Sequence, residues 1–120
     1  MTDSKIENEA TLVWTSICPV EDIKPDTGVC ALVNSEQVAV FRYGSGTTVY
    51  AISNYDPFGE ANVLSRGITG SLKNRPVVAS PLYKQHFDLI TGECLEDEAI
   101  SVKTYPVRVQ KGMVEVGTAG

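Results

Sequence analysis

Short runs of β-forming residues, separated by turn-forming residues, occur along almost the whole of this 120-residue chain. Alternating or β-branched runs predict strands at 11–15, 29–33, 37–43, 48–53, 76–80, 86–89, 102–109 and 113–116. Turn-forming residues separate several of them, at 34–36, 44–46, 91–92 and 110–112. Many short strands with these spacings are typical of an antiparallel β sandwich or barrel. We therefore expect an all-β fold.

Helical signals are confined to two short segments. Residues 19–23 carry a proline followed by two acids, and residues 60–66 end at a glycine, so each segment predicts one helical turn. Within the strand at 37–43, side chains alternate between Val38 and Val40 on one side and Ala39 and Phe41 on the other. We expect one of these two faces to be core, and the pattern leaves open which one.

The length of the chain is sufficient for one domain, which buries about two thirds of its unfolded surface without disulfides. Residues 1–10 are polar and acidic and lack the apolar run of a signal peptide. We therefore expect a flexible tail at 1–10 and a single domain at 11–117. No apolar run approaches the ~20 residues of a membrane span. This pattern predicts a cytoplasmic protein with no membrane partner.

Three cysteines, Cys18, Cys30 and Cys94, are scattered along the chain without a Cys-x-x-Cys pair. An odd number of unpaired cysteines, without an export signal, indicates reduced thiols rather than a disulfide framework. Cys30 lies in an apolar run, where a small buried side chain is expected. We therefore predict structural roles for all three.

The net charge of −5 is spread unevenly. No acid occurs from Ala61 to Phe87, whereas four cations lie in that stretch: Arg66, Lys73, Arg75 and Lys84. A chain that is acidic over the rest of its length repels nucleic acid, so no nucleic-acid partner is expected. The basic stretch suits an acidic partner, although a chance distribution of solvated charges explains it equally well.

Two segments carry related motifs. Residues 54–58 read NYDPF, and residues 80–83 read SPLY, followed by FDL at 87–89 and TG at 91–92. Their spacing resembles that of a Rieske iron–sulfur site. A Rieske [2Fe–2S] centre requires two thiolates on one iron and two imidazoles on the other. The four corresponding positions here are Asp56, Phe58, Ser80 and Tyr83. Since none of them is cysteine or histidine, we expect no metal and no cofactor in this chain.

From residue 49 to residue 116 the order of motifs resembles a Rieske-type ferredoxin domain. A closer resemblance is to the small-subunit family of assimilatory NAD(P)H-dependent nitrite reductases. It rests on GVCALV at 28–33, DPF at 56–58 followed by ANVLSRG at 61–67, SPLYKQHF at 80–87 and GECLED at 92–97. The resemblance implies a Rieske-like fold without cluster ligands. It also implies a large catalytic subunit that carries flavin, siroheme and an iron–sulfur cluster and reduces nitrite to ammonium.

The two loops with Rieske spacing are the expected docking surface for that large subunit. Exposed apolar groups ringed by charge are typical of an interface hot spot. The candidate contact residues are Asp56, Pro57, Phe58, Arg66, Arg75, Leu82, Tyr83, Lys84 and Gln85. We further expect Phe58 and Tyr83 to fill the space of the missing cluster and to pin the loops together by packing. The alternative is that these loops only close one end of the fold and that docking uses another face.

No catalytic residue is expected in this chain, so it is predicted to be inactive alone. His86, its only histidine, has no partner for a metal site and is expected near the surface, in loose contact with Asp88. No Gly-rich phosphate loop or dinucleotide fingerprint is present. An independent Rieske-type electron carrier and a free-standing protein-interaction module are the two alternative functions.

Overall fold

The computed structural model describes residues 12–119 as strands, short 3-10 turns and loops. The elements are β1 (Leu12–Pro19), η1 (Val20–Asp22), β2 (Thr27–Val33), β3 (Glu36–Arg42), β4 (Val49–Ser53), β5 (Tyr55–Asp56), β6 (Ala61–Asn62), η2 (Leu64–Arg66), β7 (Ile68–Leu72), β8 (Arg75–Ala79), β9 (His86–Asp88), β10 (Thr104–Tyr105), β11 (Val107–Gln110) and β12 (Met113–Ala119). The predicted all-β fold is confirmed. The expected flexible tail at 1–10 lies outside the described residues. Within 12–119, no helix is long and apolar enough to cross a membrane.

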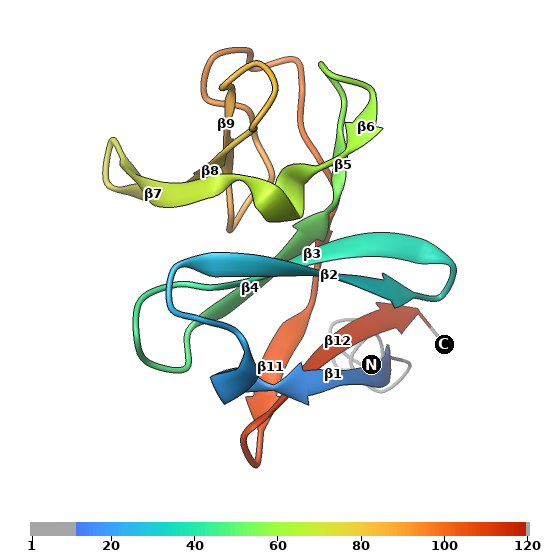
Figure 1. Cartoon of the computed structure of the whole chain (residues 1–120). Helices are drawn as coiled ribbons and strands as arrows, with labels where there is room; N and C mark the ends of the chain where they lie inside the picture. Colours follow the sequence, from blue (N-terminus) through green and yellow to red (C-terminus); the bar gives the residue numbers. More distant parts are fainter. Residues whose placement is uncertain (1–11, 120) are drawn as a thin grey trace, which may run out of the picture.

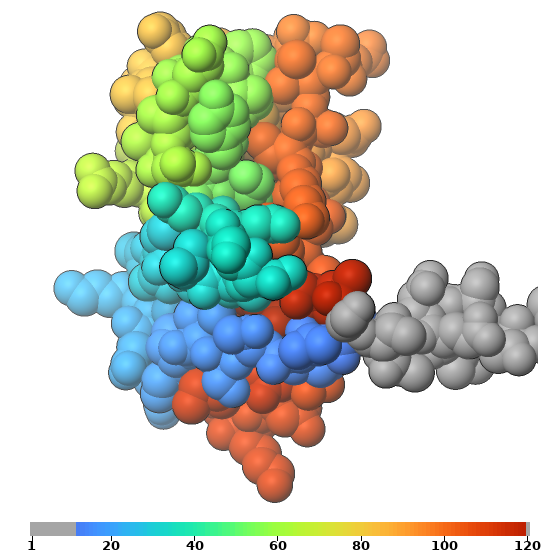
Figure 2. Space-filling model, turned by 90° about the vertical axis from the view of Figure 1, so that its right-hand side faces the viewer, coloured from blue at the N-terminus to red at the C-terminus, as the bar shows by residue number. Residues whose placement is uncertain are grey.

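The strands form antiparallel sheets arranged in two tiers (Figure 1). The lower tier contains the sheet β1-β12-β11 and the sheet β10-β4-β3-β2. The upper lobe, residues 54–102, contains the hairpin β5-β6 and the sheet β7-β8-β9. The β2–β3 hairpin lies between the upper lobe and strands β1 and β12 (Figure 2). The two loops with Rieske spacing are therefore carried by the upper lobe.

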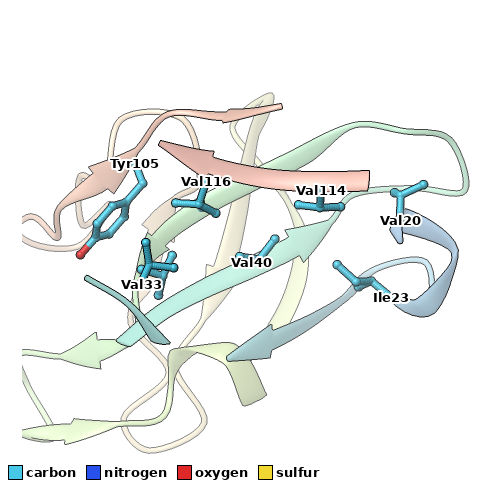
Figure 3. Close-up of a cluster of buried hydrophobic side chains, with 9 residues drawn as sticks. Val20, Ile23, Val33, Val40, Tyr105, Val114 and Val116 are labelled. Carbon is cyan, nitrogen blue, oxygen red and sulfur yellow. The ribbon is translucent and has the colours of Figure 1, made fainter. Parts of the chain in front are cut away.

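Strand β3 is buried on both faces, so the expectation that only one of its faces is core is wrong. Val38 and Val40 belong to a lower cluster with Val114 and Val116 of β12. In Figure 3 the valines of β12 point toward β2 and β3, and Val20 lies at one end of the cluster and Tyr105 at the other. The opposite face of β3 contributes to an upper cluster, made of Ala39, Phe41, Ile52, Leu64, Val78, Phe87, Leu89, Cys94 and Val102.

Three hairpins close through two-residue turns whose residues both have positive φ angles. These turns are at 34–35, 73–74 and 111–112, and each is flanked by directly paired residues. Positive φ at both positions is typical of a type I′ turn, whose twist matches that of antiparallel strands. The expected turns at 34–36 and 110–112 are confirmed. The Lys73–Asn74 turn was not predicted, and strand β7 was missed with it.

Three further sequence expectations need correction. The strand expected at 102–109 is divided at Pro106, because β10 pairs with β4 whereas β11 pairs with β12 in another sheet. The helical turn expected at 60–66 is limited to η2, since residues 61–62 form β6. Cys30 is exposed rather than buried, whereas Cys94 is buried, and all three cysteines are free thiols.

Candidate functional site

The two loops with Rieske spacing are joined by a hydrogen bond between Asp56 and Ser80. Asp56 ends β5, and Ser80 follows β8 directly. The Ser80 hydroxyl donates to Oδ2 of Asp56, and both residues have no exposed surface. These are the two positions at which a Rieske centre has its thiolates. The side chains present here bind each other instead.

Each of these side chains also organises the loop that carries it. Oδ1 of Asp56 accepts the backbone N–H of Phe58 at 2.8 Å and that of Gly59 at 3.2 Å. The Ser80 hydroxyl oxygen accepts the backbone N–H of Leu82 at 3.2 Å. The side chain of Asp56 thus accepts three hydrogen bonds at a position with no exposed surface, which compensates for the burial of its polar atoms. Asp56 and Ser80 together form a polar clasp, the name used below for this pair.

The two aromatic side chains expected to pin the loops have different environments. Phe58 is half-buried and packs against the upper cluster, with its ring centroid 6.2 Å from that of Phe87. Tyr83 is 63% exposed and fills no interior space. The expectation that Tyr83 replaces part of the cluster volume is therefore wrong. The clasp and the packing of Phe58 hold this end of the upper lobe together.

The residues at the four ligand positions do not fit a [2Fe–2S] cluster. Such a cluster is held by soft thiolates and by imidazoles, whereas Asp56 and Ser80 offer hard oxygen atoms that are already hydrogen-bonded to each other. Phe58 has no lone pair, and the cysteines lie outside both loops. Within residues 12–119, no group of three or more His, Cys, Asp and Glu side chains is placed to hold a metal ion.

His86 is bonded to Glu96 rather than to Asp88. Its Nδ1 lies 2.6 Å from Oε2 of Glu96, and its backbone N–H donates to Oε1 of Glu96 at 2.7 Å. Burial by itself raises the pKa of Glu96, but the backbone and side-chain hydrogen bonds from His86 outweigh it and hold that pKa below its ordinary value. This pair ties the acidic segment 93–98 to β9. It gives His86 a structural role at the surface.

Arg75, one of the expected docking residues, is engaged in an ion-pair network within the upper lobe. Its Nε lies 2.5 Å from Oδ2 of the buried Asp88, and its Nη2 lies 2.7 Å from Oε1 of Glu93. Oδ1 of Asp88 also accepts the backbone N–H groups of Ile90 and Thr91. Arg75 therefore stabilises the turn after β9, and its positive charge is largely compensated.

The Asp88→Asn substitution is expected to lower the free energy of unfolding by about 2 kcal/mol at pH 7, the scale of hydrogen bonds to a charged group. Burial raises the pKa of Asp88, but hydrogen bonds from Thr91, Ile90 and Arg75 outweigh it and lower that pKa. A lowered pKa contributes stability above the ordinary value of 3.8, and this contribution is lost as the pH falls below it. Urea unfolding from pH 7 to pH 2 measures the difference, which we expect to shrink below pH 4. The exposed Glu93→Gln change is the control, with an expected cost under about 1 kcal/mol.

The remaining expected docking residues differ in how much surface they offer. Leu82, Tyr83, Lys84 and Arg66 are exposed, Pro57 and Phe58 are half-buried, and Asp56 is fully buried. The side-chain oxygen of Gln85 is buried and has no hydrogen-bond partner among the described residues. Asp56 therefore cannot contact a partner directly, but its hydrogen bonds hold the loops that carry the exposed residues.

Tyr55 of β5 is an exposed aromatic residue that the sequence analysis did not select. It precedes Asp56 in β5 and points away from it, which leaves Tyr55 43% exposed. Adjacent residues of a strand point to opposite sides, so burial of Asp56 implies that Tyr55 is exposed. On the other loop, Leu82 lies against Gly59, where an added Cβ would be 2.4 Å from Cδ1 of Leu82. We call the surface formed by Phe58, Leu82, Tyr83 and Lys84 the tip patch.

Comparison with known proteins agrees with this geometry. Residues 13–117 match the family model of the Rieske-like [2Fe-2S] domain. The nitrite reductase (NADH) small subunit of Escherichia coli strain K12 is 52% identical over 103 residues, which cover 86% of this chain and 95% of that protein. The chain belongs to the nitrite reductase (NADH) small-subunit family. The predicted resemblance is thereby confirmed.

Two further relatives extend this assignment. The NMR structure of the E. coli protein NirD superposes with a TM-score of 0.84 and 50% identity, covering 91% of this chain and 99% of that one. The nitrite reductase [NAD(P)H] large subunit of Klebsiella oxytoca is 41% identical over 104 residues, which are 87% of this chain but only 11% of that protein. A segment homologous to this small-subunit family member thus occurs within a large-subunit polypeptide.

Proposed function

We propose that the chain is a non-catalytic accessory subunit that docks on the large subunit of an NAD(P)H-dependent nitrite reductase. The observation that carries the proposal is the Klebsiella large subunit, in which a homologous segment is covalently part of the large chain. Fusion into one polypeptide keeps the two domains together in the same molecule. A separate chain of the same family requires a noncovalent interface to reach that arrangement.

The chemistry of nitrite reduction belongs, in this proposal, to the large subunit. The family resemblance implies that flavin, siroheme and an iron–sulfur cluster reside there and that the complex converts nitrite to ammonium in the cytoplasm. The oxygen and aromatic groups at Asp56, Phe58, Ser80 and Tyr83 do not fit an additional iron–sulfur centre in this chain. The small subunit therefore contributes a surface that binds the large subunit rather than an electron-transfer centre.

The tip patch is the proposed docking surface. Leu82 is 47% exposed and Tyr83 63% exposed, and both lie on the loop that the clasp holds against residues 56–59. Exposed aromatic and aliphatic groups on a rigid support lose little conformational entropy on binding, which favours a hot spot. Lys84 supplies a peripheral charge that no described residue pairs.

Replacing Leu82 and Tyr83 by aspartate is expected to abolish co-elution with the large subunit on a sizing column. Each change places a charge in an apolar contact, and losses of about tenfold or more in affinity per residue are typical of hot spots. The same variants are expected to remove any effect of the small subunit on NAD(P)H-dependent nitrite reduction. Thermal unfolding of the isolated variants should be unchanged, since both side chains are exposed.

Leu32→Asp is the matched control for this experiment. Leu32 is 72% exposed on the β2–β3 hairpin, in the lower tier, so its substitution is expected to leave the complex intact. If Leu32→Asp disrupts the complex and the tip variants do not, docking uses the lower tier. If the wild-type chain neither co-elutes nor changes turnover, the accessory-subunit proposal itself is overturned.

A further inference from the structure

The sheet β1-β12-β11 has one face on the lower cluster and one face turned outward. Val114 and Val116 of β12 belong to the lower cluster, so the residues that alternate with them, Glu115 and Gly117, point to the other side. Directly paired residues share a face, which adds Trp14 of β1, opposite Gly117. The same pairing places six more residues on this outer face: Leu12, Ser16, Arg108, Gln110, Met113 and Ala119. Every side chain among them is half-buried or exposed, so the outer face is open to contact.

Trp14, the only tryptophan of the chain, is held in a fixed position on this face. Its ring lies over Gly117, where an added Cβ would be 3.3 Å from Cζ3 of the ring and 3.3 Å from Cβ of Pro106. The guanidinium carbon of Arg108 lies 4.0 Å from the ring centroid, and Nε of Arg108 is 2.7 Å from Oε1 of Glu115. A tryptophan stacked against a paired arginine loses little freedom on binding, and these two residue types are enriched in interface hot spots.

A hollow of about 290 Å³ adjoins the outer face where β1 begins and β12 ends. Its apolar lining includes Leu12, Tyr105, Pro106 and Ala119. The two charged residues of the lining, Glu36 and Lys103, form an ion pair at 3.0 Å. The volume is near the lower limit of small-molecule pockets, which suits an inserted side chain better than a whole ligand. We call the hollow together with Leu12, Trp14, Pro106, Gly117 and Ala119 the terminal corner.

Both ends of the fold meet at the terminal corner. Leu12, the first residue of β1, pairs directly with Ala119, the last residue of β12, so the two strands begin and end side by side (Figure 1). The family model matches 13–117, which is the same stretch from β1 to β12. In the Klebsiella protein the homologous segment is 11% of the polypeptide, so the rest of that chain joins the segment at one end or at both. Whichever end is joined, the large-subunit polypeptide leaves the fold at this corner.

Covalent attachment gives the adjoining large-subunit segment a high effective concentration at the corner, so even a weak contact there is occupied in the fused protein. A small subunit that is a separate chain lacks this attachment and has to bind the same segment through the contact alone. The charges of the outer face and of the hollow are paired internally, Arg108 with Glu115 and Lys103 with Glu36. An uncharged, apolar segment therefore fits the corner, as is typical of an interface core.

We propose that the terminal corner binds the segment of the large subunit that adjoins the homologous domain in the fused protein. An apolar side chain of that segment enters the hollow, and the segment packs against the ring of Trp14. The corner thus adds a second contact, on the lower tier, to that of the tip patch, and its role rests on the accessory function proposed above.

Photo-cross-linking of the full-length chain with the complete large subunit tests the proposal. A benzophenone amino acid is placed either at Ala119, in the corner, or at Lys111, in the turn before β12. The seven residues of β12 span about 20 Å, so position 111 is a matched control at the other end of the same sheet. We expect a cross-link from position 119 to the large subunit and none from position 111. Mass spectrometry identifies the linked peptide.

The outcomes separate the corner from the accessory function itself. Absence of a cross-link from position 119 in a complex that co-elutes overturns the assignment of the corner and leaves the accessory function standing. A cross-link from position 119 to residues 1–11 of the same chain, or to a second copy of the chain, also overturns that assignment by identifying another occupant. Failure of the unmodified chain to co-elute with the large subunit would instead contradict the accessory function.

Two substitutions measure what the corner contributes to binding. Ala119→Asp places a charge at an exposed position of the corner and is expected to weaken binding of the large subunit about tenfold or more in calorimetric titration. Trp14→Ala is expected to act similarly, whereas Trp14→Phe, which keeps a ring over Gly117, is expected to retain binding. Lys111→Asp is the control and is expected to change nothing. Thermal unfolding shows whether Trp14→Ala remains folded, and equal affinities of Ala119→Asp and Lys111→Asp would contradict the assignment in either case.

Discussion

The Asp56→Ala variant is expected to lose about 3 kcal/mol of unfolding free energy, which lowers the midpoint of thermal unfolding by roughly 10 °C. Alanine removes the acceptor of three donors at once, namely the Ser80 hydroxyl and the backbone N–H groups of Phe58 and Gly59. Buried donors without an acceptor lose hydration in the folded state and recover it only on unfolding. Urea and thermal unfolding of the isolated chain measure this loss.

A double-mutant cycle separates the clasp from the other bonds of Asp56. Ser80→Ala removes one donor and is expected to cost about 1 kcal/mol. The coupling between the two changes is expected to be about 1 kcal/mol or more, because the residues are direct partners. Tyr83→Ala, at an exposed position of the same loop, is the control, with an expected cost within about 0.5 kcal/mol. A coupling near zero would show that the clasp does not hold the loops together.

The Phe41→Ala variant is expected to be destabilised by about 4 kcal/mol, the usual scale for a core aromatic residue. Phe41 is completely buried in the upper cluster. Its ring lies so close to Gly28 that an added Cβ there would be 2.6 Å from Cε1 of the ring. The ring therefore fills the space between β3 and β2 without room for another side chain, and its loss leaves a cavity. Calorimetry or chemical unfolding measures the change.

Val40→Ala tests the same strand from its opposite face. Val40 is fully buried in the lower cluster, so its truncation is expected to cost about 2 kcal/mol. A strand with one solvent-exposed face would instead show a large effect at one of these positions and a small one at the other. Val13→Ala, at a half-exposed position of β1, is expected to change stability by less than about 0.5 kcal/mol. Tolerance of either core substitution would contradict the two-sided burial of β3.

Hairpins with strong local signals were predicted correctly from the sequence. The turns at 34–35 and 111–112 combine polar or glycine residues with flanking β-branched runs, and both are two-residue turns in the structure. Strand β7 was missed because the sequence of 68–72, ITGSL, has no clear alternation, and its turn contains neither glycine nor proline. Lys73 and Asn74 adopt positive φ nonetheless, since the pairing of β7 with β8 imposes it. Tertiary context overrode a weak local preference there.

The candidate site was predicted in its location but not in its internal contacts. The spacing of 54–58 and 80–83 identified the two loops that meet at the end of the upper lobe. It did not show that Asp56 would be buried, that Tyr83 would be exposed or that Arg75 would pair with Asp88. Those outcomes depend on partners 13 to 24 positions away in the chain. The periodicity of side chains within one strand does not predict contacts between residues this far apart in the chain.

The sequence by itself determined the identity of the chemical groups and the turns at 34–35 and 111–112. The absence of cysteine and histidine at Asp56, Phe58, Ser80 and Tyr83 is a property of composition and spacing, and it decides that a [2Fe–2S] cluster does not fit. Only the tertiary structure decided that β3 has two buried faces and that Asp56 and Ser80 bond to each other. Side-chain periodicity fixes which residues share a face of a strand. Which faces are covered depends on how distant strands and loops pack, and that is set by the whole fold.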